Sequence, residues 1–305
     1  MNIALIGSTG LIGSAVYSEL NDEYQLTTYG RNAQNDKFLD ISDVKNIESL
    51  NLKGYDTLIH CAGITDEQFE QNPEKAFNQG TYCTSILVDH AIKSGISKII
   101  YFSTAHVYGS LENHISEGTP PNPLSSYAIT HYSSEQIIRS IAAKSNTSCL
   151  IIRPNAVFGI PLNLNSFNRW WLVPYSFPLD GVKENKIILK SSGMQKRNFI
   201  STSDLAKYVK FYLIDSKLFN KFDIVNPIGP ETISIKEFAQ KCAGYITGIN
   251  KFECTVEIKS EYKSTISTND FKYKTLHNKF ICTETTDNYL SKIIPMIKTL
   301  DHEQI

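Results

Sequence analysis

The chain has 305 residues, and its 30 lysines and arginines nearly balance its 31 aspartates and glutamates, for a formal net charge of −1 at pH 7. This length can bury a substantial core, in one large domain or two closely joined ones. The balanced charge gives no overall field that would attract a nucleic acid or an anionic membrane surface, so an anionic ligand must be held by a local site.

The six cysteines are widely scattered, with no Cys-x-x-Cys pair and no histidine beside them at zinc spacing. We therefore expect a reduced, cytoplasmic protein without a metal site. The segment from Met1 to Gly7 lacks a basic leader, and no later apolar run approaches the roughly 18 residues that suggest a membrane span. Neither secretion nor insertion into a membrane is expected.

Short apolar runs alternate with amphipathic stretches in the first half of the chain. The amphipathic stretches Leu11–Leu20 and Thr84–Lys93 are long enough to form helices that cross between parallel strands. Runs as apolar as Lys-Ile-Ile-Tyr-Phe suit a parallel sheet that is covered on both faces. The pattern predicts an α/β fold with a doubly wound parallel sheet. The expected strands are Ile3–Ile6, Gln25–Tyr29, Thr57–Cys61, Lys98–Phe102 and Cys149–Ile152.

A glycine-rich turn follows the first strand and opens a helix, with glycines at positions 7, 10 and 13. Glycines at this place permit a tight turn and let the backbone approach a pyrophosphate, which the N–H groups of the helix N-terminus stabilise. The turn therefore predicts a dinucleotide site. Its expected contacts are Gly7, Thr9, Gly10, Leu11, Ile12 and Gly13.

The end of the second strand bears on the choice of dinucleotide. An acidic residue there would bind the adenosine ribose, whereas Arg31 would pair with a 2′-phosphate. This favours NADP(H) over NAD(H), although a solvated surface arginine is an alternative interpretation. Further residues at strand ends are expected to flank the adenine and the pyrophosphate: Asp40, Ile41, Cys61, Ala62 and Gly63.

The residue composition of the chain changes after Gly159. Residues 161–180 are aromatic and rich in turn signals, with Pro161, Pro174 and Pro178 punctuating the segment. We interpret this segment as the start of a smaller lobe that covers the substrate, after which the chain returns to the main sheet around residues 197–204 and 222–226. The predicted dinucleotide-binding domain comprises residues 1–160 and 196–226, and the predicted substrate lobe comprises residues 161–195 and 227–305.

Several motifs occur in a specific order along the chain: Gly7 to Gly13, Ser103-Thr104 before Val107-Tyr108-Gly109, Tyr127-x-x-x-His131, Arg153-Pro-x-x-Val-Phe-Gly159, Arg197-Asn-Phe-Ile and Asn226-Pro-Ile-Gly. With these motifs the chain resembles an extended short-chain dehydrogenase/reductase over nearly its whole length. Members of that family are nucleotide-sugar epimerases, dehydratases and ketoreductases.

The resemblance implies roles for four residues. Thr104 would hydrogen-bond the reacting sugar oxygen, and Tyr127 would be the general acid/base at that oxygen while hydride moves to or from the nicotinamide. His131 stands where the family has a lysine that binds the nicotinamide ribose and acidifies the tyrosine. A histidine can make that hydrogen bond but is often uncharged near neutral pH, so we expect a less acidic tyrosine. His106 would contact the sugar or exchange a proton, with a hydrogen-bonded loop histidine as the alternative.

The resemblance also implies a substrate. Ala105 and His106 replace the Asp-Glu pair of the family's dehydratases, which disfavours 4,6-dehydration, and Arg197 matches an arginine that grips a nucleotide diphosphate. Asn155 lies one place before the family's usual asparagine. The expected substrate contacts are therefore Thr104, Ala105, His106, Asn155 and Arg197. Four aromatic residues could stack on the base or form the core of the lobe: Trp170, Trp171, Tyr175 and Phe177.

These features predict an NAD(P)-dependent enzyme that acts on a nucleotide-diphosphate sugar by hydride transfer at the 4-position, as a 4-ketoreductase or a 4-epimerase. The alternative, raised by His131, is a catalytically weak or inactive cofactor-binding sensor or scaffold on the same fold. A homodimer is a further expectation from the resemblance.

Overall fold

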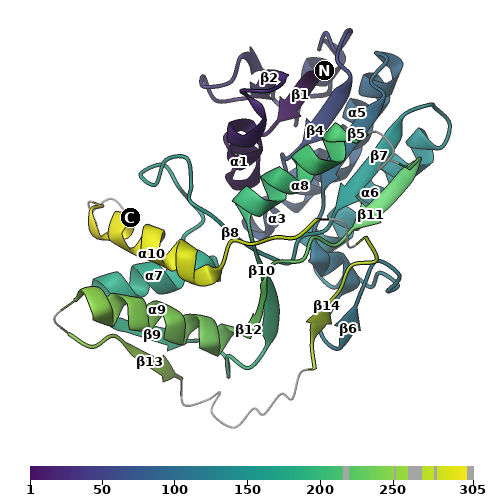
Figure 1. Ribbon diagram of the computed structural model, residues 1–305. Coiled ribbons are helices and arrows are strands. Elements are labelled where there is room, and N and C mark those ends of the chain that lie inside the picture. Colours follow the sequence, from purple (N-terminus) through teal and green to yellow (C-terminus); the bar gives the residue numbers. More distant parts are fainter. Residues whose placement is uncertain (216–219, 251, 260–269, 278–279, 301–305) are drawn as a thin grey trace.

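The computed structural model describes residues 1–215, 220–250, 252–259, 270–277 and 280–300. A seven-stranded sheet, in which every paired strand is parallel, forms the centre of the larger part (Figure 1). Its strand order is β11-β7-β5-β4-β1-β2-β3. The strands are β1 (Asn2–Ile6), β2 (Gln25–Gly30), β3 (Lys37–Phe38), β4 (Thr57–His60), β5 (Lys98–Phe102), β7 (Ser148–Ile152) and β11 (Phe222–Val225). The five strands expected from the sequence are thus confirmed to within one residue at each end.

Helices cover both faces of this sheet, which explains its continuous apolar runs. Successive residues of a strand point to opposite faces. Ile3 and Leu5 pack with α1 (Leu11–Leu20) and α8 (Thr202–Ile214), whereas Ala4 and Ile6 pack with the helices of the other face. That second face is covered by α2 (Val44–Glu48), α5 (Thr84–Lys93) and α6 (Ser126–Ala142). The doubly wound α/β fold is confirmed.

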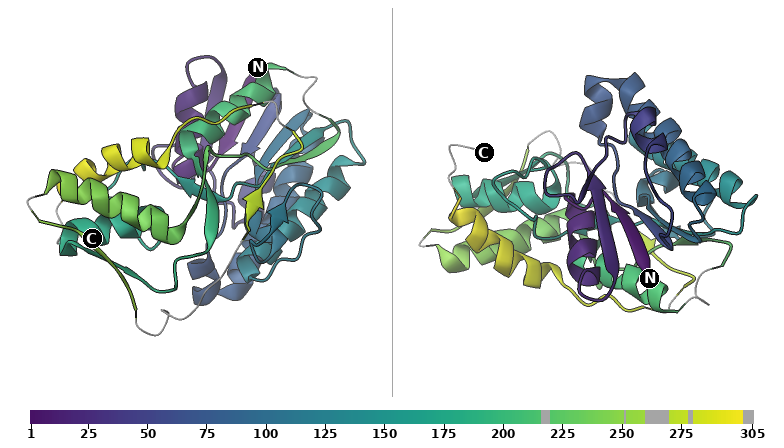
Figure 2. Two further views of the ribbon diagram at one scale, coloured as in Figure 1. Left: turned by 60° about the horizontal axis from the view of Figure 1, so that its bottom comes forward. Right: turned by 90° about the horizontal axis from the view of Figure 1, so that it is seen from above.

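Three helices form the core of a second layer, which Figures 1 and 2 show beside the sheet. They are α7 (Val173–Glu184), α9 (Ile235–Ile249) and α10 (Thr286–Lys298), and they share one cluster of buried side chains. Two short strands accompany them, β9 (Lys186–Leu189) and β13 (Thr255–Ile258), which pair in parallel. Within the described ranges, no helix is long and apolar enough to cross a membrane.

Helix α7 occupies part of the segment in which prolines were expected to mark turns. Pro174 stands in its first turn, where the missing N–H costs nothing, but Pro178 lies inside the helix. Proline at 178 cannot donate to the carbonyl of Pro174 four residues earlier. That carbonyl instead accepts a hydrogen bond of 2.9 Å from the hydroxyl of Tyr289 on α10, so the helix continues through the proline.

The prediction that residues 197–204 return to the main sheet was wrong for the strand in this segment. Strand β10 (Lys196–Ser201) pairs with β8 (Ala156–Phe158) and β12 (Glu231–Ser234) in a separate three-stranded sheet. Strand β7 has β11 on one side and β5 on the other, so neither of its sides is open to β10. Ile200 of β10 and the helix that follows, α8, nevertheless pack against the main sheet.

The remaining elements are short. They are α3 (Asp66–Gln71), α4 (Pro73–Phe77), a π-helical turn (Asn78–Cys83), a 3-10 turn (Ala105–Tyr108), β6 (His114–Ile115) and β14 (Lys272–Tyr273). Strand β14 belongs to the stretch expected in the smaller lobe, and it pairs with β6, which follows the main-sheet strand β5 and its 3-10 turn. The chain then reaches α10 beside α7 and α9 (Figure 1).

Candidate active site

The glycine turn has the geometry of a cradle. Gly7 has a φ of +84°, and its carbonyl accepts a hydrogen bond of 3.0 Å from the N–H of Gly10. A Cβ at Gly13 would lie 2.0 Å from the oxygen of Gly7, and one at Gly7 would lie 2.6 Å from the nitrogen of Ala62. Gly10 is the N-cap of helix α1 and provides no side-chain cap, so the first N–H groups of the helix are available to an anion. These residues fit a dinucleotide pyrophosphate.

A cleft of about 480 Å³ opens beside this turn. Six of the residues predicted to bind the cofactor line it: Gly7, Thr9, Arg31, Ile41, Ala62 and Gly63. The other predicted residues are not among those that line this cleft. Gly10, Leu11, Ile12 and Gly13 form the N-terminus of α1, and the carboxylate of Asp40 accepts hydrogen bonds from Ser42. The N–H of Cys61 donates to Ile6 in the sheet.

The cleft is also lined by residues that the sequence did not assign to the cofactor. Arg169 and Trp171 come from the loop before α7, and Gln79 comes from the π-helical turn. Gln68 lies on α3, where its side chain completes a capping box with Thr65. The spacing Thr-x-x-Gln in the loop after β4 is a helix-start signal that could have located these residues. Of the four aromatic residues, Tyr175 and Phe177 are buried in the lobe and Trp170 packs against them, whereas Trp171 is 52% exposed at the cleft.

The four residues predicted to be catalytic lie together. Ser125 caps α6 by accepting the N–H of Ala128, which places Tyr127 in the first turn and His131 one turn later. The ring centroids of Tyr127 and His131 are 4.6 Å apart, and the ring centroid of His106 lies 6.3 Å from that of Tyr127. Thr104 lies two residues after the end of β5, and its hydroxyl accepts a hydrogen bond of 3.2 Å from the N–H of His106.

Burial dominates the ionisation of this cluster. Burial raises the pKa of Tyr127, although hydrogen bonding with Thr104 and the positive charge of Arg169 lower it in part. Burial lowers the pKa of His106, and the charge of Arg197 lowers it further. The phenol of Tyr127 is therefore protonated and His106 is neutral at neutral pH.

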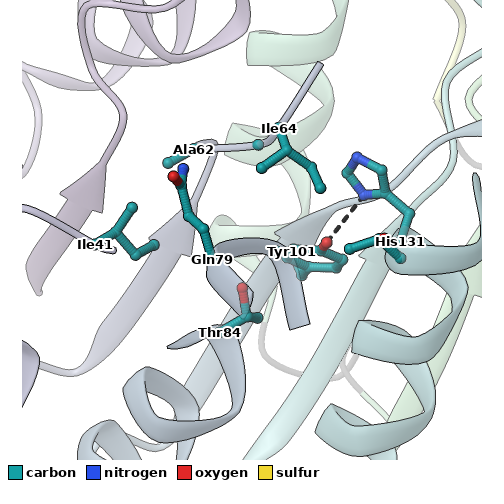
Figure 3. A pocket seen from close by; sticks show the side chains of 10 residues that line it. Ile41, Ala62, Ile64, Gln79, Thr84, Tyr101 and His131 are labelled. Atoms are coloured by element: carbon teal, nitrogen blue, oxygen red, sulfur yellow. Dashed lines mark hydrogen bonds between the residues drawn. The ribbon is translucent and has the colours of Figure 1, made fainter. Parts of the chain in front are cut away.

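His131 is neutral for the same reason. Burial lowers the pKa of His131 to about 3, and His60 and His106 add to the effect. Its Nδ1 lies 2.9 Å from the hydroxyl of Tyr101 on β5 (Figure 3). Both residues line a small cavity that adjoins the cleft and shares Ile41, Ala62, Gly63 and Gln79 with it. Tyr101 is a site residue that sequence reasoning missed, although a hydroxyl in a buried run needs a partner.

The residues predicted to bind the substrate differ in their burial and in their hydrogen bonds. Arg197 on β10 is half-buried and burial lowers its pKa, and one of its nitrogens donates to the carbonyl of Lys196 at 2.7 Å. Asn155 accepts the N–H of Asn198, and its buried Nδ2 has no hydrogen-bond partner among the described residues. Ala105 is fully buried, and its N–H donates to Pro154. In the described part of the chain, no group of three or more acidic, histidine or cysteine side chains could hold a metal ion.

The sequence is similar to those of known proteins. The model of the NAD dependent epimerase/dehydratase family matches residues 3–226. The dTDP-D-glucose 4,6-dehydratase of Mus musculus is 28% identical over 190 residues, which cover 58% of this chain and 49% of that protein. The N-acetyl-alpha-D-glucosaminyl-diphospho-ditrans,octacis-undecaprenol 4-epimerase of Escherichia coli O157:H7 is 22% identical over 222 residues, which cover 70% and 63%. The chain thus spans about half the length of the mouse relative and less than two thirds of the bacterial one.

The fold is also similar to that of solved structures. The structure of UDP-glucose 4-epimerase from Thermotoga maritima, with UDP-glucose, has a TM-score of 0.78 and 17% sequence identity. The similarity covers 97% of this chain and 98% of that chain. At this level of identity the match establishes the shared fold, while the chemistry has to be inferred from the side chains of the site.

Proposed function

The chain belongs to the NAD dependent epimerase/dehydratase family, and we propose that it transfers hydride at the 4-position of a nucleotide-diphosphate sugar, as a 4-ketoreductase or a 4-epimerase. The observation that carries this proposal is the cluster of Thr104, Tyr127 and His131 beside the cleft that follows the glycine turn. The glycine turn and the N-terminus of α1 would hold the cofactor pyrophosphate.

The side chains have distinct tasks in this proposal. When bound, the nicotinamide cofactor supplies the acceptor or donor of hydride. The hydroxyl of Tyr127 gives a proton to the 4-oxygen of the sugar as that oxygen gains negative charge, or takes it in the reverse direction. The hydroxyl of Thr104 donates a hydrogen bond to the same oxygen, and neutral His131 donates one toward the nicotinamide ribose.

The substrate is inferred from the groups that would hold it. The guanidinium of Arg197 offers two parallel hydrogen bonds to a diphosphate, and Nδ2 of Asn155 is a buried donor for a sugar hydroxyl. Ala105 and His106 follow Thr104 where a dehydratase of the family would carry Asp-Glu. We therefore propose oxidation or reduction at C4 without loss of water, although three of the relatives are named as dehydratases.

The test is turnover. The purified protein is incubated with UDP- and dTDP-linked hexoses, with the corresponding nucleotide 4-ketosugars and, in a separate arm, with N-acetylglucosaminyl diphospho-undecaprenol, each with NAD+ or NADPH. We expect a 4-epimer or a 4-alcohol from a nucleotide sugar. Turnover of the polyprenyl substrate alone would contradict the nucleotide carrier, and a 4-keto-6-deoxy product would contradict the reaction. Tight cofactor binding without any turnover would favour the sensor or scaffold, the second hypothesis, which the neutral His131 supports.

The proposed cofactor is NADP(H) rather than NAD(H), because Arg31 lines the cleft directly after β2. Charge-assisted hydrogen bonds contribute about 1.5–3 kcal/mol, so Arg31→Ala is expected to raise the Kd for NADPH by roughly 10- to 100-fold. The Kd for NADH, measured on the same variant, is the control and should change little. Equal losses for both cofactors, or NAD+ retained through purification, would contradict the preference.

A further inference from the structure

We propose that Tyr101 is a positioning residue that holds His131 in the neutral tautomer whose Nε2–H faces the cofactor cleft. The inference rests on the proposed function, in which His131 donates a hydrogen bond to the cofactor. It explains how a histidine can donate this hydrogen bond at the position where the enzymes that this chain resembles have a lysine.

Tyr101 and His131 are held in fixed places by different elements. Tyr101 lies on β5, three residues before Thr104, and His131 lies on α6, one turn after Tyr127. Both side chains are buried, with relative exposures of 3% and 4%. The phenol oxygen lies 2.9 Å from Nδ1, and Figure 3 shows the two rings meeting at the cavity wall. The pair is therefore preorganised before any ligand binds.

The protonation states limit this hydrogen bond to two directions, from the phenol O–H to Nδ1 or from Nδ1–H to the phenol oxygen. Burial raises the pKa of Tyr101, so it keeps its O–H, and burial lowers the pKa of His131 to about 3, so its ring has one N–H. A buried hydroxyl needs an acceptor. Ser134, whose hydroxyl lies near Tyr101, already donates to the backbone carbonyl of Gly80 or of Thr130, at 2.6 and 2.9 Å. In the proposed arrangement Tyr101 donates to Nδ1, 2.9 Å away, and the ring proton of His131 is on Nε2.

The other side of the imidazole faces the cleft wall. A Cβ built at Gly63 would lie 3.8 Å from Nε2 and 3.7 Å from Cε1 of His131. Gly63 lines both the cofactor cleft and the small cavity. A lysine ammonium has three equivalent protons and donates in any rotation, whereas a neutral histidine donates from one nitrogen only. The histidine therefore requires a partner that selects the nitrogen, and Tyr101 is placed to do so.

The ¹⁵N spectrum of histidine-labelled protein without ligand tests the tautomer directly. We expect His131 to show a protonated Nε2 and an unprotonated Nδ1, with no change as the pH falls from neutrality to about 5, well above the lowered pKa. Tyr101→Phe should produce a mixture of tautomers. A protonated Nδ1 in the unmodified protein would overturn the proposal. This measurement uses the unmodified protein alone, so it does not depend on whether the Tyr101→Phe variant folds.

Cofactor affinity tests the consequence. Loss of a net hydrogen bond predicts a Kd for NADPH about three- to tenfold higher in Tyr101→Phe. The matched control is Tyr289→Phe, which removes another buried hydroxyl with a 2.9 Å bond and should lower Tm without changing that Kd. In the His131→Lys background, Tyr101→Phe should have no effect on the Kd. An unchanged Kd in the single variant would overturn the proposal. The Kd measurement contains no sugar, so its outcome is independent of whether the protein turns over a nucleotide sugar.

Discussion

Replacing Tyr127 by phenylalanine is expected to lower kcat for sugar oxidoreduction by roughly 10²- to 10⁴-fold, the usual contribution of a positioned general acid or base. The ring of Tyr127 packs against Ile64, Phe69 and Ala76, and phenylalanine keeps that packing. The Kd for the cofactor should therefore change little. Steady-state kinetics and a cofactor titration on the same preparation measure the two effects.

The control for Tyr127→Phe is Tyr208→Phe. Tyr208 is a buried tyrosine of α8, on the face of the main sheet opposite to the one that α6 covers. Its replacement should leave kcat unchanged. A Tyr127→Phe variant with a kcat close to that of the unmodified protein would show that the proton at the sugar oxygen comes from another group, with His106 the neighbouring candidate.

Replacing Glu135 by glutamine is expected to lower the free energy of unfolding by about 3–5 kcal/mol, because it leaves a buried arginine charge without a counter-ion. Glu135 accepts two hydrogen bonds from Arg153, one of them 2.9 Å from Nε, and both side chains are buried. Burial opposes the charge of Arg153, but Glu135 outweighs that effect and raises its pKa. Urea unfolding measures the loss.

Two variants separate the ion pair from packing. Asp89→Asn removes the exposed pair with Lys93 on α5 and should cost about 0.3–0.5 kcal/mol. The double variant Glu135→Leu with Arg153→Met removes both buried charges and should recover most of the stability that Glu135→Gln loses. A double variant that is less stable than the single one would contradict the account. Glu135 follows Tyr127 and His131 at the spacing of one helix face, so the pair also anchors the helix that carries the catalytic residues.

The features predicted correctly from the sequence are those that local physics determines. The strands of the main sheet are continuous apolar runs because helices cover both faces, and the glycine turn follows from backbone clashes at Gly7 and Gly13. Tyr127 and His131 meet because four residues span about one helical turn. These features leave their signal in residues close together in the chain, although some of the contacts behind them, such as that of Gly7 with Ala62, are long-range.

The features that were missed depend on distant partners. Strand β10 joins another sheet because β11, later in the chain, takes the edge of β7. Helix α7 continues through Pro178 because Tyr289, 115 residues after Pro174, supplies the missing donor. The partnership of Tyr101 with His131 joins residues 30 positions apart on a strand and a helix. Periodicity and spacing report on none of these contacts.

The most direct test of the central claim is the pH dependence of single-turnover hydride transfer from NADPH to a nucleotide 4-ketosugar, in the unmodified protein and in His131→Lys. A lysine charge about 5 Å from the phenol, at an effective dielectric constant near 20, lowers a pKa by about two units. We expect the Tyr127 midpoint to lie above that of an ordinary phenol in the unmodified protein and to fall by about two units in the variant. Identical midpoints, or no hydride transfer to any nucleotide sugar, would contradict a buried phenol working beside an uncharged histidine.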